Sequence, residues 1–195
     1  MIRKSRSGHP DYGLAMLAMH WTTVALMIST CVAVWLVDAV GTREQAAWLV
    51  MLHRSLGVTI MLLTPLRFAV RRRTRLPALP ADLPAIQRAA ARASARLLYV
   101  LLMLQPLLGL AASLLHGDRV VLFGAVELPA WLPANRTLAH QLFKLHDWSA
   151  VALLTLIGLH ASAALYHHFI RRDAVLAGML PGVTPLTVAS GRAVS

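Results

Sequence analysis

Residues 142–170, LFKLHDWSAVALLTLIGLHASAALYHHFI, form the segment of this sequence with the clearest structural signal. It is long and apolar enough to cross a bilayer as a helix, and it places His146 near its start and His160 near its end. These histidines are fourteen residues apart, which is within about 40° of four full helical turns and roughly 21 Å along the helix axis. Both imidazoles therefore lie on one face at two depths. Because ionisable side chains inside a membrane are costly, this face is a candidate functional site.

The rest of the chain has the same apolar character. Of its 195 residues, 57% are hydrophobic and 14% are charged, which is too apolar for an ordinary soluble domain. The apolar residues form four long blocks, and these blocks lack the polar faces that a soluble helical bundle needs. We therefore predict one domain over residues 1–195, an all-α membrane protein with a four-transmembrane-helix bundle. Its helices are expected at about 14–37, 46–70, 95–115 and 142–170.

The net charge of +11 orients this bundle and does not indicate a nucleic-acid partner. Basic residues gather before the first helix, between the second and the third, and after the fourth, whereas the other two connections hold few. This asymmetry follows the positive-inside rule. We therefore predict a multi-pass protein whose N- and C-termini are both cytoplasmic.

The two longer connections carry local signals of their own. Pro80 and Pro84 exclude a helix from most of the middle connection. Its last part, AIQRAAARASARLL (85–98), is expected to form a separate basic helix on the anionic membrane surface. The external connection, 117–141, is expected to hold an interfacial element anchored by Trp131.

This topology pairs four histidines by depth. His20 begins the outward first helix and His160 ends the inward fourth, so both lie toward the cytoplasm. His53 begins the inward second helix and His146 begins the inward fourth, so both lie toward the outside. Taken singly, each would more often be a packing or hydrogen-bonding residue. Together they form two pairs at two depths.

Paired imidazoles favour haem iron over the other metals that histidine binds. Neutral imidazole also suits zinc and copper. Zinc, however, usually needs four ligands around one point. Two axial imidazoles from opposite helices match a six-coordinate b-type haem, which has no vacant position and favours electron transfer over oxygen binding. We therefore predict two haems, with the iron held by His20, His53, His146 and His160.

Two arginines in the apolar blocks are further candidates. Arg54 and Arg67 need anionic partners, because an unpaired buried charge costs several kcal/mol. Haem propionates, one toward each side of the membrane, would serve, so both arginines are candidate cofactor-binding residues. Snorkelling of the long side chain to the interface is the alternative, and it suits Arg67 better than Arg54, which adjoins a ligand.

Several short motifs resemble the bacterial cytochrome b561 family. They are HW at His20, LHRSLG at His53, KLHDW at His146 and GLHASAALYHHFIRRD at His160, and the resemblance covers nearly the whole chain. It implies the same four histidine ligands, and Arg67 falls where the family carries an arginine. It also implies electron transport through haem iron in the bacterial inner (plasma) membrane.

Within the family, the chain most resembles stand-alone diheme oxidoreductases that act as superoxide oxidase. The resemblance implies two haem b cofactors, superoxide as electron donor and ubiquinone as electron acceptor. Two alternatives stay open at this point. One is a cytochrome b membrane anchor that passes electrons from a periplasmic dehydrogenase or hydrogenase subunit to quinone. The other is a histidine-lined metal transporter.

A few polar residues outside the two pairs suit such a function. His167 lies two turns beyond His160 on the same face, where it would line a quinone pocket or carry a proton, or simply sit at the interface. Cationic residues of the external side would draw a small anion toward the outer haem by electrostatic steering, or would merely be solvated. They are Arg119, Arg136 and Lys144.

Overall fold

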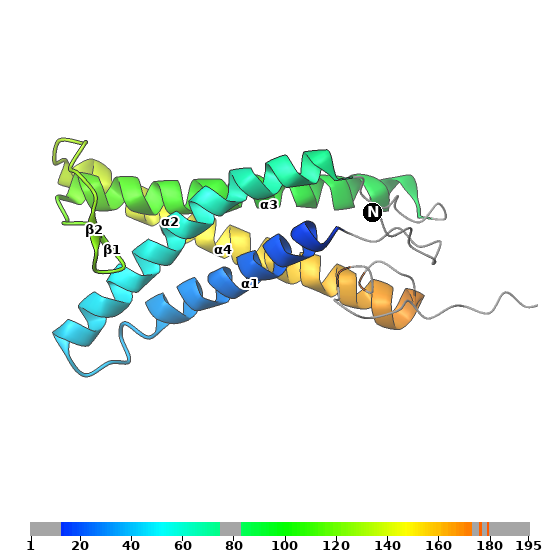
Figure 1. Cartoon of the computed structure of the whole chain (residues 1–195), viewed down its shortest axis with the longest axis horizontal. Coiled ribbons are helices and arrows are strands. Elements are labelled where there is room, and N and C mark those ends of the chain that lie inside the picture. The colour runs from blue at the N-terminus through cyan, green and yellow to red at the C-terminus, as the bar shows by residue number, and fades with distance from the viewer. Residues whose placement is uncertain (1–12, 75–82, 173–175, 177–178, 180–195) are drawn as a thin grey trace, which may run out of the picture.

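Four long helices dominate the structure. The computed structural model describes residues 13–74, 83–172, 176 and 179. Each long helix is apolar enough to cross a membrane, which confirms the predicted all-α membrane protein with four spanning helices. The helices, labelled in Figure 1, are α1 (Leu14–Trp35), α2 (Arg43–Arg73), α3 (Ala85–His116) and α4 (Arg136–Tyr166).

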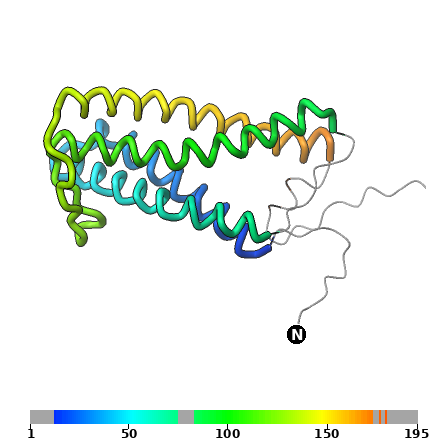
Figure 2. The backbone as a smooth tube through the Cα atoms, turned by 90° about the horizontal axis from the view of Figure 1, so that it is seen from above, coloured from blue at the N-terminus to red at the C-terminus, as the bar shows by residue number. Residues whose placement is uncertain are grey.

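The helices form two antiparallel hairpins that meet along α2 and α3 (Figures 1 and 2). Helix α1 packs along α2, and α3 packs along α4, whereas α1 and α4 do not pack directly on each other in the described part of the chain. We call the end that holds the α1–α2 and α3–α4 connections the hairpin end, and the opposite end the terminal end. A cavity bounded by α1 and α4 occupies the space between the two hairpins.

Local capping residues explain where two of the helices begin. The Thr42 side chain accepts a hydrogen bond from the backbone N–H of Gln45, 3.2 Å away, at the start of α2. The Asn135 side chain does the same for Leu138, at 3.0 Å, at the start of α4. Each cap satisfies a backbone donor that the first helical turn leaves free. Helix α4 therefore begins six residues before the expected 142.

The start of α3 corrects one expectation. Residues 85–98 do not form a separate surface helix but are the first turns of α3, which is continuous from Ala85 to His116. The physical reason is composition, since this stretch is rich in alanine and arginine, both good helix formers, and has neither glycine nor proline to interrupt it. At the other end, Gly117 adopts a left-handed φ of 90° and ends the helix.

The external connection folds into a small antiparallel hairpin of β1 (Val121–Leu122) and β2 (Val126–Glu127). Its turn uses positive φ at Phe123 and Gly124. The hairpin lies on α2, where the backbone N–H of Phe123 donates to the hydroxyl of the fully buried Ser55 at 2.8 Å. The connection is thus a packed element, which agrees with an interfacial role.

The last helix changes its winding near the terminal end. After Tyr166 the chain continues as a short π-helix, η1 (His167–Arg171). Wide turns of this kind are rare and are often found at functional sites. His167 and His168 are the first two residues of η1.

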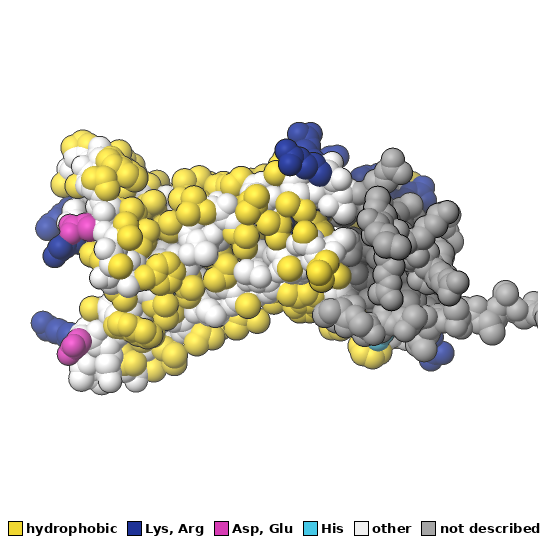
Figure 3. All heavy atoms as spheres, viewed as in Figure 1, with side chains coloured by type: hydrophobic (Ala, Val, Ile, Leu, Met, Phe, Trp, Pro, Cys, Tyr) yellow, Lys and Arg dark blue, Asp and Glu magenta, His cyan; other side chains and the backbone are white. Residues whose placement is uncertain are grey.

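Large apolar side chains cover the outside of the bundle (Figure 3). Leu62, Val100 and Leu159, for example, are more than half exposed. Charged side chains lie toward the two ends of the face drawn in Figure 3. An apolar belt between charged ends is the surface expected of a protein surrounded by lipid.

Candidate functional site

The first histidine pair lies toward the hairpin end. His53 is the tenth residue after the start of α2 at Arg43, and His146 is the tenth after the start of α4 at Arg136, so the two lie at matching depth. Their ring centres are 6.2 Å apart, and the ring planes are nearly perpendicular, at 84°. The depth pairing expected from the sequence therefore holds for these two rings.

Hydrogen bonds determine which nitrogen of each ring carries the proton. His53 donates from Nδ1 to the backbone carbonyl of Thr30 at 2.9 Å. His146 donates from Nδ1 to the backbone carbonyl of Gln105 at 3.0 Å. With the proton on Nδ1, each ring keeps its lone pair on Nε2, and in His146 this atom accepts a hydrogen bond from the Gln105 side-chain amide at 3.3 Å. This is the tautomer that binds a metal, held by the type of backbone contact that commonly orients histidine ligands.

The separation of the two rings also fits an iron between them. A metal bound at ~2.0–2.1 Å from one nitrogen of each imidazole separates the two ring centres by roughly 6 Å. The observed 6.2 Å agrees with this value. Across the described residues there is no group of three or more metal-ligating side chains, so a zinc-type centre finds no ligand set in that part of the chain.

Two residues of α3 shape the surroundings of His146, and sequence reasoning missed both. The Gln105 side-chain amide donates to the backbone carbonyl of His146 at 3.0 Å, and its carbonyl oxygen accepts a hydrogen bond from Ser149. Gly109 makes room for the ring, because a Cβ at this position would come within 2.9 Å of His146 Cε1. A polar residue and a glycine inside an apolar helix were the available signals.

The second pair borders the cavity between the hairpins. His20 lies in the first turns of α1, and His160 lies six residues before the end of α4 at Tyr166. Both rings line a cavity of about 360 Å³ with otherwise mostly apolar walls from all four helices. This volume falls within the range of ligand sites in proteins, ~300–1,000 Å³. The structure thus brings His20 and His160 to one hollow from opposite helices.

Arg67 also lines this cavity, beside His20. Its guanidinium donates from Nη2 to His20 Nδ1 at 2.8 Å. The Nε atom of Arg67 is buried without a hydrogen-bond partner. An orphaned buried donor at the wall of a cavity fits an anionic group in that cavity. Contact between Arg67 and a propionate stays a prediction.

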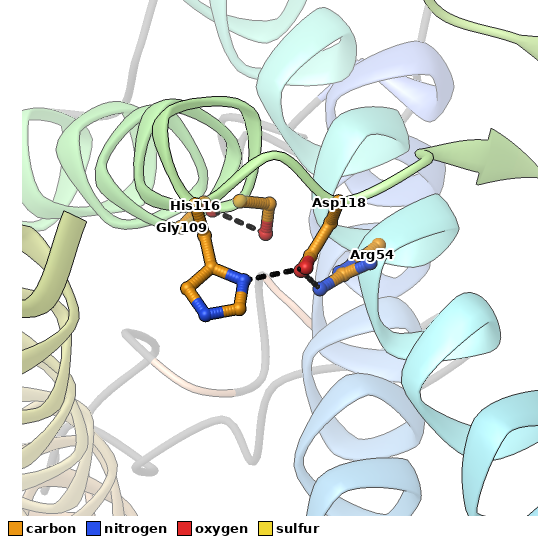
Figure 4. A network of polar contacts seen from close by, with 5 residues as sticks. Arg54, Gly109, His116 and Asp118 are labelled. Carbon is orange, nitrogen blue, oxygen red and sulfur yellow. Dashed lines mark hydrogen bonds and ion pairs between the residues drawn. The ribbon is translucent and has the colours of Figure 1, made fainter. Parts of the chain in front are cut away.

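Arg54 has a partner that the sequence did not suggest (Figure 4). It forms an ion pair with Asp118 in the external connection, and Asp118 also accepts a hydrogen bond from His116 Nδ1 at 2.7 Å. Partial burial acts to raise the pKa of Asp118, but the His116 hydrogen bond and the Arg54 charge outweigh it and hold the pKa below its usual value. Arg54 therefore ties α2 to the external connection, and its contact with a propionate stays a prediction.

The other candidates lie apart from the two pairs. Arg119 pairs with Glu127 across the β-hairpin at 2.5 Å, and both side chains are exposed. Arg136 and Lys144 are exposed on α4 at the hairpin end. His167 is half-buried at the start of η1, beyond the terminal end of α4. Three cations thus surround the hairpin end, on the side of the His53–His146 pair.

Comparison with known proteins agrees with this arrangement. The profile of the family described as prokaryotic cytochrome b561 matches residues 11–182, a span that holds all four helices and both histidine pairs. The chain therefore belongs to the prokaryotic cytochrome b561 family, and it is a membrane protein of electron transfer whose family implies b-type haem.

Individual relatives cover nearly the whole chain. A Yersinia pestis protein named probable superoxide oxidase CybB is 30% identical over 174 residues, which are 89% of this chain and 97% of the relative. The Escherichia coli K12 protein named cytochrome b561 homolog 2 is 31% identical over 87% of this chain and 90% of its own length. Cytochrome b561 homolog 1 of the same organism is 27% identical over 87% of this chain and 97% of its own length.

Proposed function

We propose that the protein is a diheme b-type cytochrome that transfers electrons from superoxide to ubiquinone. His53 and His146 hold one haem, and His20 and His160 hold the other. The observation that carries this proposal is the existence of two histidine pairs, one with rings 6.2 Å apart and the other facing across a cavity. The two histidines of each pair come from different helices and would hold one haem iron between them.

The choice of superoxide rests on two supports. One relative, from Yersinia pestis, bears the name of a probable superoxide oxidase. The other support is the pair of exposed cations Arg136 and Lys144 on α4, which would steer a small anion toward the nearer haem site, whereas Arg119 is paired with Glu127. Because the positive-inside rule places the hairpin end outside the cytoplasm, superoxide reaches it from the periplasm of a bacterial inner membrane.

The overall reaction balances without a further reactant. Two superoxide ions each lose one electron and leave as dioxygen, while ubiquinone takes up both electrons and two protons from water. The haems, when bound, supply one-electron transfer between the two sides. The chain holds His53 and His146 in the ligating tautomer, and two histidine ligands would leave the iron no vacant position for oxygen. His167, near the terminal end, is placed to exchange protons with a reduced quinone.

A stopped-flow experiment tests the activity. Superoxide is mixed with the purified oxidised protein, and the haem α-band is followed with and without an excess of a ubiquinone analogue. We expect fast haem reduction, followed by reoxidation that depends on the quinone. Haems that do not react with superoxide would contradict the proposed donor and would favour a membrane-anchor cytochrome, which should then co-purify with a periplasmic redox subunit.

Ligand variants test the haem sites independently of the donor. We expect His146→Ala to lose the haem of the hairpin end, so that the haem content falls from two to one per chain. His140→Ala is the matched control, because His140 is an exposed histidine of the same helix. Two haems retained in His146→Ala would overturn the assignment, and a protein without a Soret band would return the metal transporter to consideration.

A further inference from the structure

Three polar side chains gather at one end of the cavity that holds His20 and His160. They are Arg67 and Arg71, one turn apart on α2, and Tyr99 on α3, and all three line the cavity. The Cζ atoms of Arg67 and Arg71 lie 5.5 Å and 5.7 Å from the centre of the Tyr99 ring. Both guanidinium groups therefore contact one aromatic ring inside a largely apolar hollow.

This cluster has unused hydrogen-bonding capacity. The hydroxyl of Tyr99 and Nε of Arg67 are both buried and have no hydrogen-bond partner. A buried polar atom left unsatisfied costs free energy, so such atoms in a native protein usually mark the place of a missing partner. Two of them at one end of one cavity indicate a ligand that accepts hydrogen bonds.

The missing partner is an anion. Among the described residues that line the cavity there is neither aspartate nor glutamate, and no described carboxylate forms an ion pair with Arg67 or Arg71. Two positive charges at ~4–6 Å from one ring in an apolar cavity repel each other. A negative group between or beside them offsets this repulsion. The cluster thus supplies two cations and a hydroxyl donor for an oxyanion.

The bond between Arg67 and His20 points to the same ligand. Arg67 donates to His20 Nδ1 at 2.8 Å, which leaves the ring proton on Nε2. Nε2 becomes available to a metal only when the proton moves to Nδ1, and a protonated Nδ1 cannot accept from Arg67. A ligand that uses His20 must therefore release the Arg67 guanidinium, and a carboxylate of the same ligand is a suitable new partner.

We propose that Arg67, Arg71 and Tyr99 form an oxyanion site for the two carboxylates of the porphyrin seated between His20 and His160. The inference rests on the proposed haem site and adds Arg71 and Tyr99 to it. Two guanidinium groups match two carboxylates, and Tyr99 donates one further hydrogen bond. A lipid phosphate from the terminal end carries the same chemistry and is the other source that the experiment must distinguish.

The first experiment compares variants of the intact holoprotein. The midpoint potentials of both haems are measured by redox titration, and haem loss is measured by transfer to a haem-free globin. We expect Arg71→Leu to lower the potential of the terminal-end haem, because a nearby cation stabilises the reduced form, and to speed its loss about tenfold. Tyr99→Phe should change the potential and the rate of haem loss in the same direction but to a smaller extent. Arg71→Lys should recover part of the potential that Arg71→Leu loses.

The neighbouring Arg72 provides the matched control. It is an exposed arginine of the same helix that contacts Phe68 at 5.2 Å and does not line the cavity, so Arg72→Leu should leave both potentials unchanged. If Arg71→Leu and Tyr99→Phe have the same midpoint potentials and the same rates of haem loss as Arg72→Leu, the proposed oxyanion site is wrong. The proposed function would still stand in that case, provided that His160→Leu removes the terminal-end haem.

Infrared difference spectroscopy identifies the occupant. Protein is prepared with ¹³C in the porphyrin carboxylates, and spectra are recorded between the oxidised and reduced forms. We expect isotope-sensitive carboxylate bands that shift in Tyr99→Phe and Arg71→Leu. The opposite result is that the carboxylate bands stay unchanged in both variants, while phosphate bands shift in the variants and on removal of lipid. That result would assign the site to a lipid headgroup and overturn the proposal.

Discussion

At the scale of single residues, backbone carbonyls decide the chemistry of the His53–His146 pair. The backbone carbonyls of Thr30 and Gln105 each accept a hydrogen bond from Nδ1 of one ring, so both rings carry their lone pair on Nε2. Of these two contacts, the one at His146 is reinforced by a side chain, since the Gln105 amide also donates to the His146 carbonyl. Partners of this kind commonly change metal affinity 10–100-fold when they are removed.

We therefore expect Gln105→Leu to disturb the haem of the hairpin end. Leucine removes the hydrogen bonds that the Gln105 side chain donates to His146 and the one that it accepts from Ser149, so the ring loses its side-chain support. The affinity for this haem should fall about tenfold, and its electron paramagnetic resonance signal, which depends on the angle between the ring planes, should change. Gln87→Leu, at an exposed glutamine of the same helix, should change neither. An unaltered signal in Gln105→Leu would show that the side chain does not orient the ring.

Gly109→Ala tests the space that the structure reserves for the His146 ring. The new Cβ would lie 2.9 Å from Cε1 of a ring that its Nδ1 hydrogen bond holds in place, so the ring must shift. We expect loss of most of the hairpin-end haem, measured as haem per chain. Gly158→Ala is the control, because nothing lies within 4 Å of a Cβ there, and alanine should be neutral or slightly stabilising. Full haem content in Gly109→Ala would contradict the close contact.

At the scale of elements, the external connection acts as a packed cover on α2. Phe123 donates to Ser55, and Asp118 pairs with Arg54, so the two residues of α2 that directly follow His53 both contact this connection. Val120, which directly precedes β1, is almost completely buried, and its backbone carbonyl accepts a hydrogen bond from the N–H of Leu128 at 2.9 Å. The connection between α3 and α4 is therefore held against the neighbouring helix hairpin at the level of the outer ring pair.

Asp118→Asn should weaken this contact in a pH-dependent manner. Because the pKa of Asp118 is lower in the folded protein, its carboxylate stabilises the fold above the ordinary pKa of ~3.9, and this contribution is lost as the pH falls through the folded-state value. A hydrogen bond to a charged group is worth ~1.5–3 kcal/mol, so we expect the midpoint of thermal unfolding to drop by about 3–12 °C at pH 7. The drop should vanish in strong acid.

The control for this prediction is another carboxylate of the same connection. Glu127 pairs with Arg119 on the open surface, where ion pairs contribute little to stability. Glu127→Gln should therefore leave the unfolding midpoint unchanged at both pH values. A drop of equal size at pH 7 and in acid for Asp118→Asn would exclude the ionised carboxylate as its cause.

At the scale of the whole molecule, each histidine pair joins the two helix hairpins. Rings from α2 and α4 meet toward the hairpin end, while rings from α1 and α4 face one cavity toward the terminal end. Helix α4 takes part in both pairs. Because α1 and α4 do not pack directly on each other in the described regions, a flat cofactor can lie between them.

Membrane orientation is tested with single cysteines in a Cys31→Ser background. Ala130 is exposed in the connection at the hairpin end, and Ala85 is exposed at the start of α3 near the terminal end. The positive-inside rule predicts that Ala130→Cys reacts with a membrane-impermeant thiol reagent added from the periplasm, and that Ala85→Cys reacts only after lysis. The reverse pattern would invert the topology and place the hairpin end in the cytoplasm.

Local patterns in the sequence determined the class of the protein and the histidine pairs. The length of the apolar blocks predicted four spanning helices, and the fourteen-residue spacing of His146 and His160 predicted one face with two depths. The face of a helix on which a residue lies depends only on its spacing from nearby residues, so these features can be predicted from the sequence alone. The separate surface helix over 85–98 was the wrong prediction of this kind, because alanine and arginine continue α3 without a break.

Contacts between separate helices were decided only by the tertiary structure. The pairing of Arg54 with Asp118, the clamp of Gln105 on His146, and the meeting of Arg71 with Tyr99 each join residues of different elements. Such contacts depend on how far each helix is rotated and tilted against its neighbour, and that geometry follows from side-chain packing along the whole bundle. No local period in the sequence carries this information.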